Sequence, residues 1–117
     1  MTVILVVEDE VLTSEYLEFV LESAGYEAIP AGSADEALAV LEHRDDVDLM
    51  VTDINLPGDM NGIALAALVR DRRPEINIVV VTGYSAPTSD ELPAGSLFVP
   101  KPYNAQKMID AIHHFQH

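Results

Sequence analysis

Five polar residues that could do chemistry follow apolar, β-branched runs of the sequence. They are Glu8, Asp9, Asp53, Thr82 and Lys101. If these runs form parallel strands, their carboxyl ends meet at one edge of the sheet, where open α/β sheets bind their ligands. The sequence therefore predicts three carboxylates, one hydroxyl and one ammonium group at a single rim.

Such crowding of carboxylates has a physical cost. Two carboxylates roughly 5 Å apart repel by about 3 kcal/mol at an effective dielectric constant near 20, so the site needs raised pKa values or a cation. Mg²⁺ prefers oxygen ligands and phosphate oxygens. A carboxylate such as Asp53 beside Mg²⁺ can attack a phosphoryl donor and form an aspartyl phosphate. Thr82 and Lys101 would then share the phosphoryl oxygens with Mg²⁺.

The strands that must position these residues are visible as five apolar runs separated by segments with helical spacing. This alternation is typical of an α/β domain with a parallel sheet. The predicted strands cover residues 3–7, 27–30, 49–52, 76–81 and 97–99.

Four helices are predicted between and after these strands. The first covers residues 11–24, with Leu17, Val20, Leu21 and Ala24 on its inner face and Gly25 as its stop. The second begins after Ser33, which has capping-box spacing with Glu36. The third covers 63–72, and Asn104 caps the last. Between the fourth and fifth strands, residues 85–96 contain two prolines and one large apolar residue, which predicts a loop with at most one helical turn.

The composition limits the possible partners. The 117 residues fit one domain, 1–117, and the net charge of −14 disfavours direct binding of nucleic acids or anionic membranes. No apolar run approaches the length of a membrane span, and the absence of Cys fits a reducing interior. We therefore expect a cytoplasmic protein.

Four blocks of the sequence carry a family resemblance: V-V-E-D-E (6–10), D-I-N-L-P-G (53–58), V-T-G-Y (81–84) and F-V-P-K-P-Y (98–103). In this order and spacing, they resemble the receiver domain of bacterial two-component response regulators. The resemblance implies a doubly wound, five-stranded parallel sheet in the flavodoxin-like order 2-1-3-4-5. It also implies a module that is phosphorylated by a sensor histidine kinase and switches conformation to control a partner, as a monomer or a phosphorylation-dependent dimer.

The resemblance assigns a role to each matching residue. It implies that Asp53 is the phospho-acceptor and that Mg²⁺ is held by Glu8, Asp9, Asp53 and the backbone carbonyl of Asn55. It implies that Thr82 and Lys101 sense the phosphoryl group, that Phe98 is the switch aromatic and that Lys101–Pro102 is a cis peptide. Tyr84 is either a second switch residue or a surface aromatic.

Two departures from the family pattern suggest a subgroup. The loop P-G-D-M-N-G is one residue longer than the usual P-x-x-D-G form, with Asn61 in place of Asp, and the interval from Thr82 to Phe98 is short. Both features resemble receivers that lack an ordered fourth helix and are often paired with HWE-type histidine kinases.

Two other functions fit the sequence less well. A Mg²⁺-dependent phosphohydrolase with an Asp nucleophile carries D-x-D, whereas this chain has Asn55 at the second position, which argues against turnover of external substrates. A flavodoxin-like FMN carrier needs a phosphate cradle where Glu8 and Asp9 would repel an anion. Because the chain starts at Met1 and ends after a complete predicted helix, we expect a stand-alone receiver rather than an excised fragment.

Overall fold

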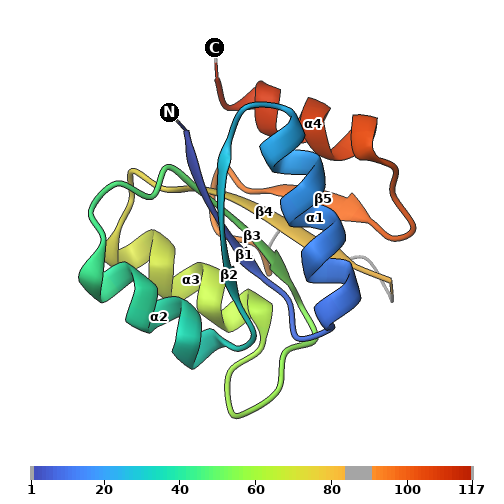
Figure 1. Ribbon diagram of the computed structural model, residues 1–117. Coiled ribbons are helices and arrows are strands. Elements are labelled where there is room, and N and C mark those ends of the chain that lie inside the picture. The colour runs from blue at the N-terminus through green and yellow to red at the C-terminus, as the bar shows by residue number, and fades with distance from the viewer. Residues whose placement is uncertain (1, 84–90, 117) are drawn as a thin grey trace.

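The computed structural model describes residues 2–83 and 91–116. Strands and helices alternate along these residues, as the apolar runs predict, and the helices lie on both faces of a central sheet (Figure 1). The elements are β1 (Val3–Val7), α1 (Val11–Ser23), β2 (Glu27–Ala31), α2 (Ala34–His43), β3 (Leu49–Asp53), α3 (Gly62–Arg72), β4 (Asn77–Thr82), β5 (Leu97–Pro100) and α4 (Ala105–His114).

The sheet has five parallel strands in the order β2-β1-β3-β4-β5. This confirms the predicted fold class and strand order. Strand β1 has the predicted bounds, and the other four strands differ from the prediction by one residue at one or both ends. The differences matter at two places: Asp53 and Thr82 are the last residues of β3 and β4 rather than the residues that follow them. Ile76, predicted to start β4, is buried just before it.

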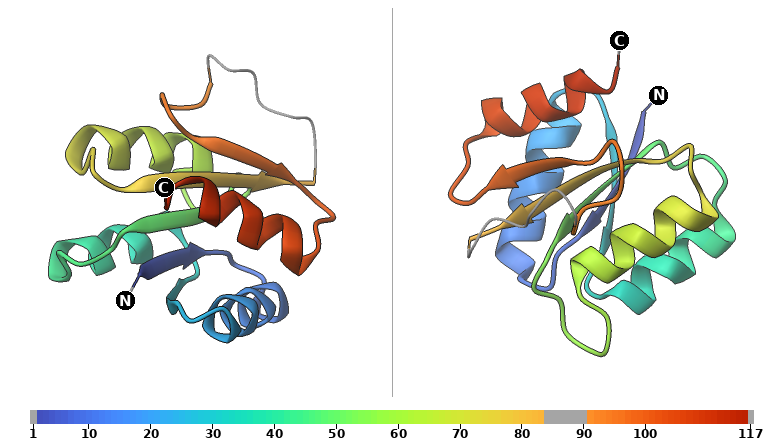
Figure 2. Two further views of the ribbon diagram at one scale, coloured as in Figure 1. Left: turned by 90° about the horizontal axis from the view of Figure 1, so that it is seen from above. Right: turned by 180° about the vertical axis from the view of Figure 1, so that it is seen from behind.

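The core is divided by the sheet into two clusters. One lies between the sheet and the pair α2 and α3, and the other lies between the sheet and the pair α1 and α4 (Figure 2). All five residues of β1 are buried, as expected for a parallel strand covered on both faces. The rigid layers on each side fix the carboxyl ends of the strands, where the candidate residues lie.

The helix ends follow the predicted capping pattern. The side chains of Ser33 and Asn104 accept hydrogen bonds from the backbone N–H groups of Glu36 and Lys107, which confirms both as N-caps. Gly25 follows α1 with φ +93°, a conformation that favours glycine. The prediction for Ala24 was wrong: α1 ends at Ser23, and Ala24 is exposed where the chain turns away from the core.

The connection between β4 and β5 is described only in part. Its residues 91–96 form turns and no helix, and Leu92 packs against the cluster beneath α2 and α3. The earlier part of the predicted loop, residues 85–90, and the candidate switch residue Tyr84 lie outside the described residues. The described part agrees with the predicted irregular fourth helix region.

The two ends of the described chain lie side by side. The Gln116 side chain donates a hydrogen bond to the Thr2 hydroxyl at 2.8 Å and accepts one from the Tyr26 hydroxyl at 3.0 Å. Both ends therefore lie at the amino ends of the strands (Figure 1). Among the described residues, no helix combines the length and the apolar character that a membrane span requires.

Candidate functional site

Lys101 joins two acidic residues from different strands. Its ammonium group donates a 2.8 Å hydrogen bond to Asp53 Oδ2 and a 3.2 Å hydrogen bond to Glu8 Oε1. The Glu8 and Asp53 side chains are 4% and 10% exposed, and that of Lys101 is 29% exposed. The Lys101–Pro102 peptide bond is cis. The carboxyl ends of β1, β3 and β5 thus bring these three residues together, as their positions after the apolar runs predicted.

The second oxygen of Asp53 is held by the backbone that follows β3. Asp53 Oδ1 accepts a hydrogen bond from the N–H of Asn55 at 3.1 Å. The chain then returns to the end of β3, because the N–H of Gly62 donates to the carbonyl of Ile54 at 2.8 Å. A Cβ atom at Gly62 would lie 1.9 Å from the carbonyl oxygen of Asp53. Only glycine therefore lets the start of α3 approach Asp53 so closely.

The electrostatics of this group follow from burial and from its mixed charges. Burial raises the pKa of the Glu8 carboxyl, and the nearby Asp53 carboxylate raises it further against the opposing effect of Lys101. Burial alone would lower the pKa of Lys101, but hydrogen bonds and charge attraction from Asp53 and Glu8 leave it raised. Lys101 is therefore a firmly protonated counter-ion for the two carboxylates.

An open cleft of about 560 Å³ exposes these groups to solvent. Its lining residues are Glu8, Asp9, Glu10, Asp53, Asn55, Gly83 and Lys101. Asp9 is exposed at the rim, whereas Glu8 and Asp53 are buried. Across residues 2–83 and 91–116, no three Asp, Glu or His side chains are arranged to hold a metal ion. The donors in the cleft still fit Mg²⁺ by type, because Glu8, Asp9 and Asp53 offer carboxylate oxygens and Asn55 offers a backbone carbonyl oxygen.

Thr82 and Phe98 lie on the same face of neighbouring strands. Phe98 is opposite Val80 in the register of β4 and β5, and Thr82 is two residues beyond Val80. Since side chains alternate along a strand, Val80, Thr82 and Phe98 share one face. Thr82 is buried and Phe98 is partly exposed. A movement at Thr82 can therefore reach Phe98 through direct neighbours on the sheet.

A second groove, of about 600 Å³, opens beside the cleft and was not predicted. It runs between α1, which contributes Leu12 and Tyr16, and the turn after β5, which contributes Lys101, Pro102 and Tyr103. Tyr16 and Tyr103 are far apart in the sequence, so no local pattern indicates that they share a groove. Burial raises the pKa of the Tyr103 hydroxyl to about 12.

This shift predicts a delayed ionisation of Tyr103. The folded pKa of about 12 lies above the ordinary value of 10.0. The folded state therefore keeps a proton that the unfolded state loses, and stability should fall as the pH rises from about 10 to about 12. Ultraviolet titration at high pH, compared with a Tyr103→Phe variant, should show one tyrosine that ionises last. If the difference between the two curves is centred near pH 10, Tyr103 is not buried as described.

Comparisons with known proteins agree on one family. A family model described as "Response regulator receiver domain" matches residues 4–113. The chain is 32% identical over 112 residues to the response regulator protein FleR of Pseudomonas aeruginosa, covering 93% of this chain and 23% of that protein. It is 34% identical over 116 residues to the sensory transduction protein RegX3 of Mycolicibacterium smegmatis, covering 96% and 49%. The chain thus spans about a quarter to a half of these curated relatives.

Solved structures show the same similarity in three dimensions. A CheY-like response regulator receiver domain protein from Methanospirillum hungatei is 31% identical with a TM-score of 0.87, and the match covers 97% of this chain and 92% of that one. The response regulator TrrA from Thermotoga maritima, solved in complex with Mg²⁺-BeF, is 29% identical with a TM-score of 0.84, covering 97% and 98%. Both similarities extend over nearly the whole of this chain.

Proposed function

Because the chain belongs to the response regulator receiver domain family, we propose that it accepts a phosphoryl group on Asp53 from a sensor histidine kinase. Receiver domains of two-component signalling accept a phosphoryl group on an Asp, bind Mg²⁺ and are usually not enzymes. The observation that supports Asp53 is its position. It is a buried carboxylate at the end of the central strand β3, in hydrogen-bond contact with a lysine and open to a cleft.

The proposed chemistry needs an Asp53 oxygen as the nucleophile. That oxygen attacks the phosphorus atom of a phosphohistidine, and a P–O bond forms as the P–N bond breaks. The leaving ring takes up one proton from solvent and departs as neutral imidazole. Lys101 already lies 2.8 Å from Asp53 Oδ2, where its charge can stabilise the negative charge of the transferred group. Beyond its own phosphorylation and dephosphorylation, we expect no turnover of external phosphate esters.

The acidic residues of the cleft are the proposed ligands of Mg²⁺. Glu8, Asp9, Asp53 and the backbone carbonyl of Asn55 would hold the ion. Mg²⁺, when bound, supplies positive charge to the phosphoryl oxygens. Since Lys101 contacts both Glu8 and Asp53, the ion must share these two carboxylates with the ammonium group. TrrA, in its complex with Mg²⁺-BeF, is the structural relative that supports this proposal.

The proposed output begins at Thr82. A phosphoryl group on Asp53 draws Thr82 and Lys101 towards it, and Phe98, on the same face of the sheet, responds to the movement of Thr82. Tyr84 remains a candidate second switch residue. We place this switch in the cytoplasm, consistent with the absence of Cys.

The experiment uses a small phosphodonor. Incubation with acetyl phosphate and Mg²⁺ should add one phosphoryl group, stable in acid and labile in base, as acetate leaves. Mass spectrometry of peptides should locate it on Asp53, and an Asp53→Asn variant should lose all labelling. Asp59, exposed in the loop after β3, provides the matched control: Asp59→Asn should be labelled like the wild type. Label on Ser, Thr or His, or steady hydrolysis of p-nitrophenyl phosphate, would contradict the proposal.

A further inference from the structure

Asn61 and Gly62 form the only Asn-Gly pair in the sequence. In such a pair the backbone nitrogen of glycine can attack the side-chain amide carbon of asparagine, because glycine has no side chain to hinder the approach and its backbone rotates freely. Asparagine is one of the heat-labile residues of proteins. The other three asparagines, Asn55, Asn77 and Asn104, precede Leu, Ile and Ala. This reactivity is therefore concentrated at the start of α3.

The fold holds both reacting groups of this pair in hydrogen bonds. Asn61 is exposed and is the N-cap of α3, where its side-chain oxygen accepts a 2.9 Å hydrogen bond from the N–H of Ala64. The N–H of Gly62 donates a 2.8 Å hydrogen bond to the carbonyl of Ile54. The Gly62 nitrogen must lose its proton and turn towards the Asn61 side chain, so both hydrogen bonds must break first. The attack therefore requires a local opening at the start of α3.

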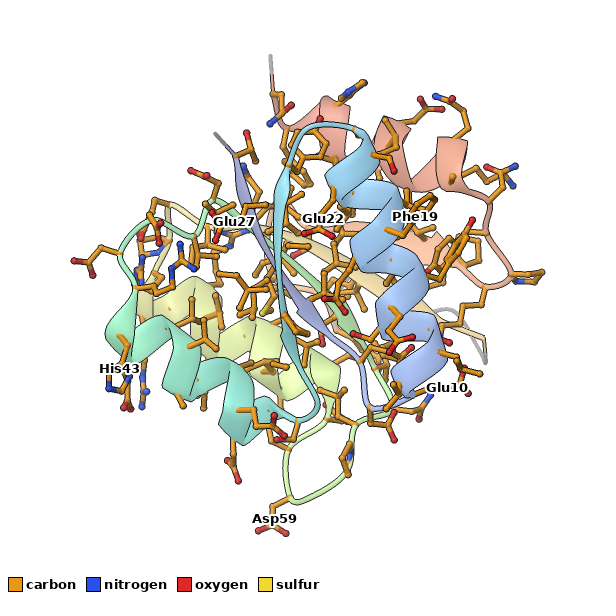
Figure 3. The ribbon with its side chains drawn as sticks, in the orientation of Figure 1. Glu10, Phe19, Glu22, Glu27, His43 and Asp59 are labelled. Carbon is orange, nitrogen blue, oxygen red and sulfur yellow. The ribbon has the colours of Figure 1, made fainter. Side chains whose placement is uncertain are left out.

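The segment that must open is the loop between β3 and α3. Gly58 in this loop has φ +92°, and Asp59, at the tip of the loop, points away from the rest of the molecule (Figure 3). Leu56 and Met60 pack against the cluster beneath α2 and α3, but both are only partly buried. A loop with so few buried side chains opens at a lower free energy than the buried strands of the sheet.

We propose that Asn61 is a site of deamidation, at a rate set by the opening of the loop between β3 and α3. Hydroxide takes the proton of the Gly62 N–H, and the nitrogen forms a bond to Asn61 Cγ. The side-chain nitrogen takes up a proton from water and leaves as ammonia, which gives a five-membered cyclic imide. Water then adds to one of the two imide carbonyl carbons and breaks its C–N bond. Opening at Cγ gives aspartate, and opening at the backbone carbonyl carbon gives isoaspartate.

The two products should affect the acceptor site differently. Aspartate at position 61 is a good N-cap whose charge is favourable at a helix N-terminus, so Gly62 stays in place. Isoaspartate adds one atom to the backbone before Gly62, where even an added Cβ atom would lie 1.9 Å from the Asp53 carbonyl oxygen. Because Gly62 has no room to shift there, isoaspartate displaces the Asp53 backbone. This consequence rests on the proposed function: only the isoaspartate form should fail to accept phosphate on Asp53.

Asn104 provides the matched control for the hydrogen bonds around Asn61. It is also an exposed N-cap, and its side-chain oxygen accepts a 2.8 Å hydrogen bond from the N–H of Lys107. The Ala105→Gly variant places a second Asn-Gly pair at the start of α4, away from the carbonyl that holds Gly62. Both proteins are incubated at mildly alkaline pH, folded and in guanidinium chloride. Mass spectrometry of peptides then locates each exchange of an NH₂ for an OH group.

The two pairs should behave alike only when the chain is unfolded. In guanidinium chloride, Asn61 and Asn104 of the Ala105→Gly variant should deamidate at similar rates. In the folded proteins, deamidation of Asn61 should be slowed about tenfold or more relative to the unfolded chain, because it waits for the local opening. Asn104 of the folded variant should react faster than Asn61, because no backbone carbonyl of the described residues accepts a hydrogen bond from the N–H at position 105.

A second measurement follows the acceptor site. Aged wild-type protein is incubated with acetyl phosphate and Mg²⁺, and phosphate-affinity electrophoresis separates the phosphorylated molecules from the others. Methylation by an isoaspartyl methyltransferase, which does not act on ordinary aspartate, measures isoaspartate in each fraction. The phosphorylated fraction should contain about tenfold less isoaspartate or lower still, because the acceptor is misplaced in that form. The Asn61→Asp variant, which carries the other product throughout, should be phosphorylated at the wild-type rate.

The outcomes separate the inference from the proposed function. Equal rates at Asn61 in the folded and unfolded protein would overturn the proposal, and so would deamidation spread evenly over the four asparagines. Equal isoaspartate in the two electrophoretic fractions would overturn the effect on the acceptor site. If freshly purified protein is not labelled by acetyl phosphate, the proposed function fails, whereas the rates of deamidation still test the modification itself.

Discussion

Replacing Lys101 by Met should destabilise the fold by about 3 kcal/mol in the absence of divalent cations. The ammonium group lies between the buried carboxylates of Glu8 and Asp53, and its removal leaves two negative charges without their counter-ion. Thermal unfolding at neutral pH should show a decrease in Tm of more than about 10 °C. Addition of Mg²⁺ should recover part of the loss, because it provides positive charge at the same carboxylates.

Two further variants distinguish this cause from simple loss of packing. Lys107, exposed on α4, is the matched lysine, and Lys107→Met should change stability by less than about 0.5 kcal/mol. In the double variant Lys101→Met with Glu8→Gln, one of the two charges is removed, so the protein should be more stable than with Lys101→Met alone. If Glu8→Gln gives no such recovery, charge repulsion is not the source of the effect.

Gly62→Ala should cost at least about 3 kcal/mol and slow the acceptance of phosphate. The added Cβ would lie 1.9 Å from the Asp53 carbonyl oxygen, 2.7 Å from the Asp53 carbonyl carbon and 2.8 Å from Ile54 Cα. All three are backbone atoms, so no side chain can rotate to relieve the contact. Either α3 moves away from β3 or the Asp53 backbone shifts, and both changes displace the acceptor carboxylate. Denaturant unfolding and the rate of acetyl phosphate labelling measure the two effects.

A second glycine at the same cleft provides the control. A Cβ added at Gly83 would lie 3.6 Å from Lys101 Cβ, an ordinary van der Waals distance, and Gly83 does not have a positive φ. Gly83→Ala should therefore change stability by no more than about 0.5 kcal/mol. Equal behaviour of the two alanine variants would show that close approach at Gly62 does not position Asp53.

The strands of the sheet could be predicted from the sequence because each is marked by a short, local pattern of residues. The apolar runs at β1, β3 and β4 are too β-branched and too continuous for exposed helices, and Ser33 and Asn104 mark helix starts by short-range hydrogen bonds. Once these strands are parallel, topology alone places Glu8, Asp53 and Lys101 at one edge. The parallel arrangement of the strands was therefore enough to predict that these three residues lie together.

The features that escaped prediction depend on contacts between distant parts of the chain. The groove formed by Tyr16 and Tyr103 needs α1 and the turn after β5 to be packed in three dimensions. The exposed apolar residues of α1, Leu12, Tyr16 and Phe19, were not predicted either, because helical spacing identifies the buried face of a helix and not the exposure of its other residues. Gly62 gives one usable signal, since a glycine that directly follows an N-cap and opens a helix indicates close approach by another backbone.

The hydrogen bond from the Gln116 side chain to the Thr2 hydroxyl holds the two ends of the described chain next to each other. A short linker between the two ends could join them without moving either one, and the ring could then be opened at another exposed connection to give a circular permutant. The position of the two ends also matters when the protein is attached to a solid support. Because both ends lie at the amino ends of the strands, a tether at either end leaves the cleft at the carboxyl ends facing away from the support.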